Sequence, residues 1–383
     1  MTLLSLWPAL PWLGPLLGIF RLARRDPDLT QAPIAAGPLV SVIIPARNEA
    51  ETIETVVRSV LTTAYGAVEV IVVDDRSTDE TAGLAAALTR EDPRVRLVRG
   101  AELPSGWLGK PWACWQGYRA ASGQLLLFTD ADTTHGPDLL GHAVGALTAE
   151  KADLLTVISR QRCDTFWERL VMPQIWVLLG LRYATAEVNR STRPRDVIAN
   201  GQFILFPRAS YEAIGTHEAV RAEVVEDLAL AQTVIRAGRK LFITHAEPLI
   251  TTRMYRGLGH MIEGWSKNIY LGGRRSFPDE PILRALVPLL LTGGMLFWLA
   301  PPVLGLIALA GAIDPLPWVL LAIALSTTFW MLVSFGMEIP LLYGLGYPLG
   351  AAVSLYIVLR SVARGARKVE WKGRVYDASA GAT

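Results

Sequence analysis

The sequence predicts a doubly wound α/β domain with a mostly parallel sheet, an N-terminal membrane anchor and C-terminal transmembrane helices. The α/β domain is indicated by short apolar runs that alternate with helical patterns from about residue 38 to residue 160. The membrane segments are indicated by long uncharged stretches near both ends of the chain. With 383 residues, the chain is long enough to hold both parts.

Residues 1–20 carry no charged side chain and are followed by three arginines within residues 21–25. The segment lacks a basic start and a small-residue cleavage site, so it predicts a membrane anchor and not a cleaved signal peptide. Its prolines disfavour a regular helix, and we therefore expect it to lie partly in the membrane interface.

The first elements of the α/β domain follow in order. Residues 40–45 form an apolar run ended by proline, which is typical of a central parallel strand. Asn48 is expected to cap the next helix, because a glutamate follows three residues later. Residues 68–73 predict the second strand, after which Ser77 repeats the capping pattern.

Later elements have weaker patterns. Further strands are expected at residues 95–98, 125–128 and 203–206, and a helix is expected at residues 223–237. Residues 163–188 are rich in tryptophan and leucine, so they predict either an interfacial amphipathic helix or a core helix of the α/β domain.

Two pairs of aspartates each follow an apolar strand directly: Asp74 with Asp75, and Asp130 with Asp132. In an open parallel sheet, ligands bind beyond the carboxyl ends of the strands. Carboxylates that face one crevice repel each other unless a divalent cation and its phosphate ligands separate them. The pattern therefore predicts a site that holds a nucleoside diphosphate through a metal ion.

The two aspartate pairs suggest different ligands, and Asp75 also has an ordinary structural interpretation. Asp75 can accept hydrogen bonds from a nucleobase imide or from ribose hydroxyls, or it can cap a helix. Asp130 and Asp132 are typical magnesium ligands, since Mg²⁺ is held by one or two carboxylates together with substrate phosphates.

Three further charged residues are candidates for chemistry. Lys110 lies in a glycine-rich stretch before a predicted helix, where it either contacts phosphate or faces solvent. Glu226 and Asp227 lie among apolar residues at the start of another predicted helix. One of them is either a general base for an acceptor hydroxyl or a favourable charge at the helix N-terminus.

A basic and aromatic patch follows this helix. It contains Arg253, Arg256 and Lys267, with Trp265 among them. These side chains either neutralise a departing diphosphate or meet the anionic headgroups of lipids.

Three uncharged or nearly uncharged stretches are candidate membrane crossings: Leu286–Ala310, Leu316–Phe335 and Ile339–Leu359. The third is the weakest, because glycines and a proline interrupt residues 344–350. Basic residues in the tail, residues 360–383, mark the cytoplasmic side. Three crossings would place this tail opposite the α/β domain, whereas two would place both on one side.

The two cysteines show neither metal-site spacing nor a disulfide framework and fit a reducing compartment.

Together, these motifs resemble family 2 glycosyltransferases with the GT-A fold over about residues 38–275. The matching segments are Ser41–Glu49, Val73–Thr81, Gly109–Lys110, Phe128–Asp132 and Val225–Asp227. Any one of these segments alone would be a weak signal, but their combined order is highly specific.

The resemblance implies a role for each matched residue. Asp75 would contact the nucleobase, Asp130 would support the donor ribose or sugar, and Asp132 would ligate Mg²⁺ or Mn²⁺. Asp227, with Glu226 beside it, would be the base for an in-line displacement that inverts the anomeric carbon. The substrate-binding residues implied by the same motifs also include Pro45, Arg47, Glu49, Asp74 and Lys110.

The segment after the implied base departs from part of the family. Many membrane-bound relatives, prominently those that polymerise sugars, carry a Gln/Arg-x-x-Arg-Trp motif here, whereas Met261–Asn268 has the tryptophan without the arginine. This favours the transfer of a single sugar. The same segment and Val369–Tyr376 are more similar to bacterial enzymes that glycosylate carotenoid or hopanoid lipids, and to ceramide glucosyltransferases. Trp265 is therefore a candidate for the acceptor site, and Lys267 for substrate binding.

The resemblance leads us to expect a multi-pass protein of the inner membrane, with its catalytic domain in the cytoplasm. It would move one hexose from a nucleotide sugar, UDP-glucose by the resemblance, to a lipid hydroxyl or carboxyl. The expected partners are this donor, the lipid acceptor and the membrane, without nucleic acid. The alternatives are a processive polysaccharide synthase and a non-catalytic membrane scaffold. The missing arginine motif argues against the first, and Asp75, Asp132 and Asp227 argue against the second.

Overall fold

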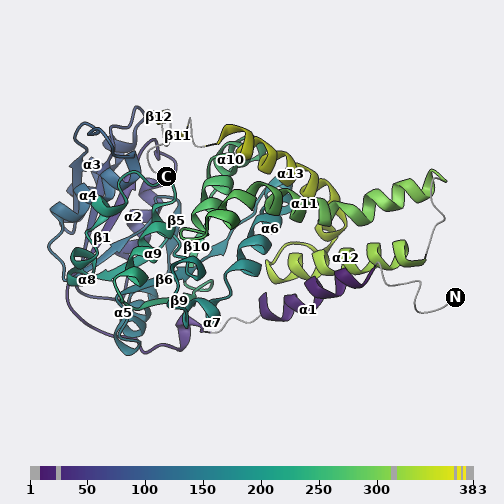
Figure 1. Cartoon of the computed structure of the whole chain (residues 1–383). Helices are drawn as coiled ribbons and strands as arrows, with labels where there is room; N and C mark the ends of the chain where they lie inside the picture. Colours follow the sequence, from purple (N-terminus) through teal and green to yellow (C-terminus); the bar gives the residue numbers. More distant parts are fainter. Residues whose placement is uncertain (1–8, 23–26, 312–316, 366–368, 372–373, 377–383) are drawn as a thin grey trace.

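The computed structural model describes residues 9–22, 27–311, 317–365, 369–371 and 374–376. An α/β domain occupies one end of the molecule, and long apolar helices extend from the other end (Figure 1). A layer of helices that includes α6 (Phe166–Arg182) and α10 (Leu258–Arg275) lies between them.

The α/β domain is built on a seven-stranded sheet of order β3-β2-β1-β4-β8-β6-β9. Its strands are β1 (Val40–Ala46), β2 (Val68–Asp74), β3 (Val95–Arg99), β4 (Leu125–Phe128), β6 (Leu154–Ile158), β8 (Ile204–Pro207) and β9 (Leu241–His245). The pairing is parallel except at β8, which is antiparallel to both neighbours, so the predicted mostly parallel sheet is confirmed. The sheet continues well past residue 160, where the alternating sequence pattern ended.

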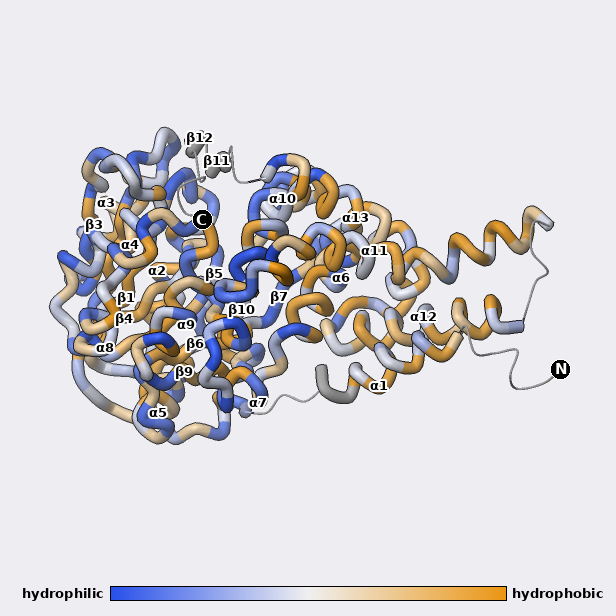
Figure 2. Tube along the Cα trace, viewed as in Figure 1, coloured by the Kyte–Doolittle hydropathy of each residue, from blue (hydrophilic) through white to orange (hydrophobic). Residues whose placement is uncertain are grey.

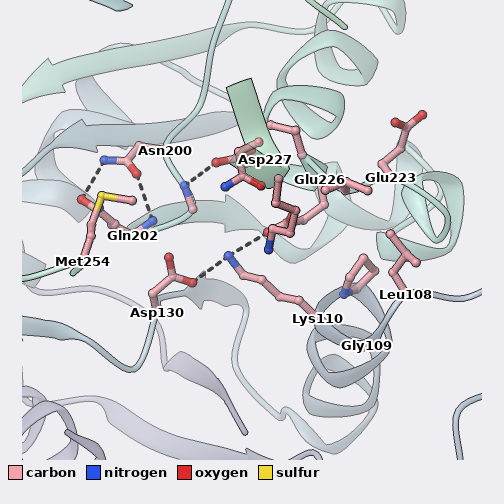
Figure 3. A pocket seen from close by; sticks show the side chains of 16 residues that line it. Leu108, Gly109, Lys110, Asp130, Asn200, Gln202, Glu223, Glu226, Asp227 and Met254 are labelled. Atoms are coloured by element: carbon pink, nitrogen blue, oxygen red, sulfur yellow. Dashed lines mark hydrogen bonds and ion pairs between the residues drawn. The ribbon is translucent and has the colours of Figure 1, made fainter. Parts of the chain in front are cut away.

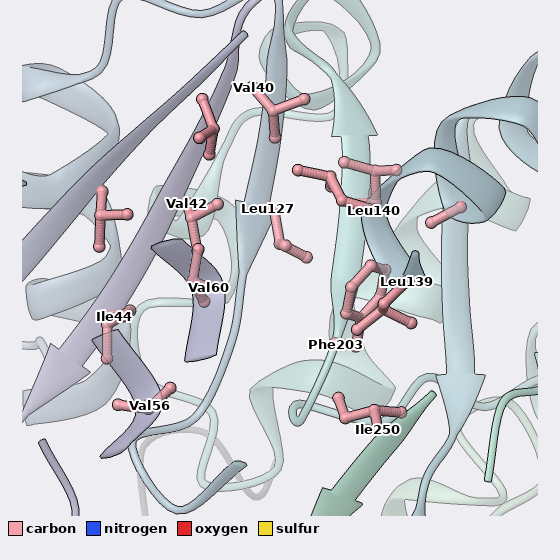
Figure 4. Packing of buried hydrophobic residues seen from close by; sticks show 14 of the residues in the cluster. Val40, Val42, Ile44, Val56, Val60, Leu127, Leu139, Leu140, Phe203 and Ile250 are labelled. Carbon is pink, nitrogen blue, oxygen red and sulfur yellow. The ribbon is translucent and has the colours of Figure 1, made fainter. Parts of the chain in front are cut away.

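Side chains of β1, an interior strand of the sheet, alternate between two hydrophobic cores. Val40, Val42 and Ile44 of β1 pack with the helices α2 (Ile53–Leu61) and α5 (Leu139–Ala149) on one face, as Figure 4 shows for part of this cluster. Ile43 points to the other face, where it packs with α4 (Gly109–Ala120) and α9 (Glu226–Arg236). Because both faces are covered, β1 is buried along its whole length and is apolar except at Ser41, as expected for a parallel strand.

The helices of this domain are α2 (Ile53–Leu61), α3 (Thr81–Glu91), α4 (Gly109–Ala120), α5 (Leu139–Ala149), α7 (Thr185–Val188), α8 (Arg208–Ala213) and α9 (Glu226–Arg236). Short 3₁₀ helices occupy Leu29–Gln31, Pro194–Asp196 and His217–Val220. The strands β5 (Thr133–His135), β10 (Ile250–Thr252) and β7 (Arg160–Gln161) form a small second sheet.

The two predicted helix caps are wrong. Helix α2 begins at Ile53, and Asn48 lies in the loop before it with a positive φ of 53°. The Asn48 side chain instead accepts a hydrogen bond from the Thr78 backbone N–H at 2.8 Å, and the Asn48 N–H donates to Ser77 Oγ at 3.0 Å. The two residues therefore tie together the loops that follow β1 and β2.

Three helical segments are long and apolar enough to cross a membrane: Pro281–Leu309, Pro317–Gly336 and Leu341–Arg364. They correspond to α11, α12 and the pair formed by the 3₁₀ helix η5 (Leu341–Gly346) and α13 (Tyr347–Arg364). Their residues are mostly apolar, whereas apolar and polar residues are mixed in the α/β domain (Figure 2).

The N-terminal segment forms the helix α1 (Leu13–Leu22) despite its prolines. The apolar helical stretch Ala9–Ile19 is shorter than a full membrane span. Trp12 stacks on Phe297 of α11 with ring centroids 4.3 Å apart, so this segment packs along the membrane helices. The basic residues within 23–26 and 366–368 lie outside the described part of the chain. The hairpin strands β11 (Val369–Trp371) and β12 (Arg374–Tyr376) are the last described elements.

Helix α6 combines features of both interpretations of residues 163–188. Its central residues Val171 and Ile175 are buried in a cluster with Met261 and Trp265 of α10 and with α13. Its ends carry exposed side chains, such as Phe166. The helix therefore joins the α/β domain to the membrane helices and is neither a purely interfacial nor a purely internal helix.

Candidate active site

A cavity of about 190 Å³ opens where the N-termini of α4 and α9 approach the end of β4 and the face of α10 (Figure 3). It is lined by Leu108, Gly109, Lys110, Pro111, Asp130, Asn200, Gly201, Gln202, Glu223, Val224, Val225, Glu226, Asp227, Met254, Lys267 and Asn268. The cavity is smaller than the roughly 300–1,000 Å³ of ordinary ligand pockets, so it accommodates part of a large substrate.

Lys110 links two of the carboxylates at this site. Its Nζ lies 2.7 Å from Asp130 Oδ1 and 2.7 Å from Glu226 Oε1. Burial alone would lower the pKa of Lys110, but Asp130 and Glu226 outweigh it and raise this pKa well above its usual value. Burial likewise acts to raise the pKa of Glu226, but the nearby ammonium outweighs it and lowers this pKa. Lys110 and Glu226 are therefore both charged at neutral pH.

Asp227 is held by backbone groups at the start of α9. Its Oδ2 accepts a hydrogen bond from the Gly201 N–H at 3.0 Å, and its Oδ1 accepts one from the Leu228 N–H at 2.7 Å. A Cβ atom at position 201 would lie 2.9 Å from Lys110 Nζ, so the glycine allows the loop to approach both side chains. Burial and the charge of Glu226 raise the pKa of Asp227 to about 6. This value suits a proton acceptor near neutral pH.

Asp132 has the properties of the expected metal ligand, whereas Asp130 is already ion-paired with Lys110. Asp132 Oδ1 is buried and has no hydrogen-bond partner among the described residues. Burial, together with the charges of Asp130 and Glu49, raises the pKa of Asp132 to about 7. A divalent cation would relieve this repulsion. No cluster of three or more His, Cys, Asp or Glu side chains that could hold a metal occurs in the described part of the chain.

The first two sequence motifs meet at the ends of β1 and β2. Arg47 is buried and donates to the carbonyl oxygens of Asp75 at 2.6 Å and Arg76 at 2.9 Å, so it holds the loop that carries Asp75. Asp74 is buried, and its Oδ1 accepts from the Ser77 N–H at 3.3 Å. Pro45 pairs with Val73 inside the sheet.

Asp75 and Asp132 lie on the same edge of the sheet. They follow β2 and β4, which are both neighbours of β1, with all three strands parallel. Glu49 follows β1 and acts electrostatically on Asp132. The predicted nucleotide-binding residues and metal ligands are thus grouped at the carboxyl ends of three adjacent strands.

The basic and aromatic patch divides into separate parts. Lys267 lines the cavity, and burial lowers its pKa to about 8. Arg253 instead pairs with Glu168 at 3.1 Å and Asp164 at 3.2 Å, and Arg256 pairs with Glu51. The two arginines are therefore paired with protein carboxylates, which is neither of the two interpretations given for them, a departing diphosphate or lipid headgroups.

Trp265 is not among the residues that line this cavity. It is buried between α6, α10 and α13, with its ring centroid 5.7 Å from that of Tyr255. Its indole N–H is buried without a hydrogen-bond partner among the described residues. Trp265 therefore packs beneath the cavity wall formed by Lys267 and Asn268.

Several cavity residues had no sequence signal. Asn200 and Gln202 flank Gly201 and hydrogen-bond to each other at 3.1 Å, which fixes the loop before β8. Asn268 lies next to Lys267, and its Oδ1 is buried without a hydrogen-bond partner among the described residues. Only the position of Gly201 just before an expected strand could have marked this loop.

Comparison with known proteins agrees with this geometry. Residues 41–215 match the family model described as Glycosyl transferase family 2. The chain is 29% identical over 256 residues to a 4,4'-diaponeurosporenoate glycosyltransferase of Staphylococcus aureus strain MRSA252, and 28% identical over 257 residues to that of strain USA300. These matches cover 65% of this chain and 64% of each relative.

One solved structure shares the fold over nearly the whole chain. It is the mannosyltransferase PcManGT from Pyrobaculum calidifontis in complex with GDP-Man and Mn²⁺. The TM-score is 0.56 at 20% sequence identity, and the match covers 92% of this chain and 96% of the other. The sheet order, the acidic strand ends and these matches lead to one conclusion: residues 41–215 form a domain similar to the family 2 glycosyltransferases, and the chain has the GT-A fold.

Proposed function

We propose that the protein is a membrane-bound, inverting glycosyltransferase that moves a single hexose from a nucleoside diphosphate sugar to a lipid acceptor. The observation that carries this proposal is the placement of Asp227. Its carboxylate lines the cavity, is fixed by two backbone N–H groups and has a pKa of about 6. A base held in this way can accept the proton of an acceptor group in one defined direction.

In the proposed reaction, the acceptor oxygen forms a bond to the anomeric carbon as the bond to the diphosphate breaks. Asp227 accepts the acceptor proton, and the diphosphate leaves with the electron pair of the broken bond. Lys110 and Lys267 place positive charge around the leaving group, which stabilises the charge that develops there. Asp132, with Asp130, would hold Mg²⁺ or Mn²⁺, which would supply further positive charge to the phosphates.

The donor is proposed to be UDP-glucose on the basis of the resemblance described above. The structural neighbour was solved with GDP-Man, and it supports the use of a nucleoside diphosphate sugar without fixing the base. The uncharged Asn268 Oδ1 would accept a hydrogen bond from a sugar hydroxyl.

The acceptor is proposed to be a terpenoid-like or sphingolipid-like lipid. The names of the curated relatives describe a glycosyltransferase that acts on a diaponeurosporenoate. Three apolar helices attached to the cavity-bearing domain support a membrane-resident acceptor. We further propose that the protein lies in the inner membrane with its catalytic domain in the cytoplasm.

The experiment that tests this function uses membranes that contain the full-length protein, an extract of the host's lipids and Mn²⁺. UDP-glucose, UDP-galactose and GDP-mannose are compared by the release of nucleoside diphosphate and by mass spectrometry of the lipids. We expect one donor to give a single-hexose lipid, and we expect the product to disappear on chelation of the metal and in Asp132→Ala. A ladder of oligosaccharides would instead support a processive synthase, and no transfer from any donor would support a scaffold.

A further inference from the structure

The third apolar segment, Leu341–Arg364, begins on the side of the membrane helices that faces the catalytic domain. Glu338 lies three residues before Leu341 and forms an ion pair with Arg160 of β7. Because β7 belongs to the small sheet of the catalytic domain, α12 has already returned to that domain when it ends at Gly336.

The same segment also ends beside the catalytic domain. Arg360 and Arg364 of α13 pair with Glu263 of α10 at 2.8 and 2.5 Å. Helix α10 carries Lys267 and Asn268 into the cavity, so this end of α13 is fixed next to the active site. Figure 1 shows α13 running back toward α10 and the catalytic domain.

The segment turns around part of the way along α12. Tyr347, the first residue of α13, hydrogen-bonds through its hydroxyl to Ser326 Oγ at 2.8 Å and stacks on Trp330 with centroids 6.0 Å apart. Ser326 lies about 15 Å from Gly336 along the helix, at about 1.5 Å per residue. A full crossing needs about 30 Å of hydrocarbon thickness, so the turn reaches only about half of that depth.

Neighbouring helices cover the 3₁₀ backbone at this turn. A Cβ atom at Gly344 would lie 2.6 Å from the backbone of Met331 in α12, and one at Gly346 would lie 2.9 Å from Leu170 in α6. Irregular backbone at membrane depth is tolerated where neighbouring helices cover it, which is the situation between α12 and α6.

The outer surface of the turn is apolar and exposed. Leu342 and Leu345 are 74% and 56% exposed, and Leu341 and Leu349 are 45% and 47% exposed. Helices α11 and α12 also carry exposed leucines, such as Leu289 and Leu320, and both helices consist mostly of apolar residues (Figure 2). Hydrocarbon chains fit an apolar surface of this kind without leaving polar groups unpaired.

We propose that Ile339–Arg364 is a re-entrant segment, which enters the bilayer from the catalytic side, turns near Tyr347 and leaves on the same side. Its exposed leucines contact the lipid chains of the leaflet nearest the catalytic domain, where a lipid acceptor would approach α10. The inference rests on the membrane location included in the proposed function.

This arrangement removes the conflict over the number of crossings. Only α11 and α12 then cross the bilayer after the catalytic domain. The arginines at the end of α13 lie on the same side as that domain, as the distribution of basic residues around membrane helices requires.

Cysteine labelling of the full-length protein in sealed, inverted membrane vesicles tests the proposal. Gly336→Cys marks the start of the segment, Ala363→Cys marks its end, and Ala310→Cys marks the far end of α11. A Cβ atom at Gly336 would have no neighbouring heavy atom within 4 Å, so this substitution is tolerated sterically. The wild type measures background labelling of Cys114, which is buried, and Cys163, which is half-buried.

A membrane-impermeant maleimide should label Gly336→Cys and Ala363→Cys from the same face, and Ala310→Cys only after permeabilisation. Labelling of the first two variants from opposite faces would overturn the proposal, because it would mean a full crossing. Labelling of all three from one face without permeabilisation would overturn it as well, because α11 and α12 would then not cross.

A nitroxide attached at Leu345→Cys tests the lipid contact. It should collide more often with oxygen, which dissolves in the bilayer, than with a water-soluble nickel complex. More frequent collisions with the nickel complex would contradict the lipid contact and would mean that Leu345 faces water or protein. Glycosyl transfer measured on the same vesicles keeps a failure of the proposed reaction separate from these outcomes.

Discussion

Glu226 and Asp227 are adjacent in the chain, but their surroundings give them different properties. Glu226 lies against Lys110, which stabilises its charge and lowers its pKa against the effect of burial. Among the described residues, Asp227 has only backbone N–H groups as hydrogen-bond partners, and burial with the neighbouring Glu226 raises its pKa to about 6. At neutral pH, Asp227 is therefore the better proton acceptor, and Glu226 remains the counterion of Lys110.

The pH dependence of transfer follows from this difference. The pKa of Asp227 is raised, so its basic form predominates above about pH 6 and is lost as the pH falls. We expect kcat to fall about tenfold per pH unit below pH 6 for a hydroxyl acceptor. Asp227→Asn should lower kcat by about 10²–10⁴-fold and remove this acidic limb. The measurement is a pH–rate profile at saturating donor.

Glu226→Gln is the matched control for this profile. It should keep an acidic limb, displaced to lower pH because the negative neighbour of Asp227 is removed. An unchanged acidic limb in Asp227→Asn would show that another group is the base. A carboxylate acceptor has no proton to lose, so a small effect of Asp227→Asn would point to that class of acceptor.

Lys110 also contributes to stability, because it neutralises carboxylates that are largely removed from water. Its side chain and those of Asp130 and Glu226 are 25%, 29% and 9% exposed. Removing one member of such a buried group costs about 3–5 kcal/mol, since the partners remain charged and unpaired. We therefore expect Lys110→Met to lower the thermal unfolding midpoint clearly in detergent.

Lys240→Met provides the comparison. Lys240 pairs with Glu150 at 2.9 Å, but both side chains are more than 40% exposed. Such surface pairs contribute about 0–1 kcal/mol. Equal shifts of the unfolding midpoint in the two variants would contradict the assigned role of Lys110.

At the scale of elements, the strands could be predicted because their apolar runs report burial on both faces of the sheet. The helix caps could not, because the partners of Asn48 are Ser77 and Thr78, about 30 residues away, and local spacing carries no information about them. The antiparallel direction of β8 could not be predicted either, because the direction of a strand depends on the path of the preceding chain.

The candidate site divides in a similar way. The acidic residues after β2 and β4 were predictable, because the sheet topology brings their ends to one edge. Asn200 and Asn268 were not, because they reach the cavity only through the packing of a loop and of α10. The ion pairs of the two arginines in the basic patch could not be predicted for the same reason, since their carboxylate partners lie far away in the sequence.

Close packing of α6 against α13 depends on a glycine. A Cβ atom at Gly350 would lie 2.4 Å from the Leu170 carbonyl oxygen, so a larger side chain forces the two helices apart. Overpacking of this kind costs about 1–3 kcal/mol. We expect Gly350→Leu to lower the thermal unfolding midpoint and to reduce transfer, because α6 and α13 support the buried face of α10.

Gly293→Leu is the control for this substitution. Gly293 also lies in an apolar helix, but nothing is within 4 Å of its Cβ position. It adds the same apolar side chain without a clash, so stability and transfer should stay close to the wild type. If both variants behave alike, the contact between α6 and α13 does not limit stability.

At the scale of the whole molecule, the catalytic domain is fixed to the membrane helices at several separated points. Ion pairs connect β7 to the end of α12 and α10 to the end of α13. The buried cluster of α6, α10 and α13 lies between these points. The cavity is therefore held in a fixed position relative to the apolar helices. Under the proposed function, a lipid acceptor need not leave the bilayer to meet the donor.

This geometry predicts surface-dilution kinetics for the acceptor. A long-chain lipid remains in the bilayer, because each buried methylene contributes about 0.8 kcal/mol to membrane binding. The enzyme then encounters acceptor at its mole fraction in the membrane and not at its bulk concentration. At fixed amounts of enzyme and acceptor in fused vesicles, adding phospholipid should lower the initial rate when the acceptor is below saturation. The KM for the donor, which arrives from water, should not change. A rate that follows bulk acceptor concentration at every dilution would instead mean that the acceptor reaches Asp227 through the aqueous phase.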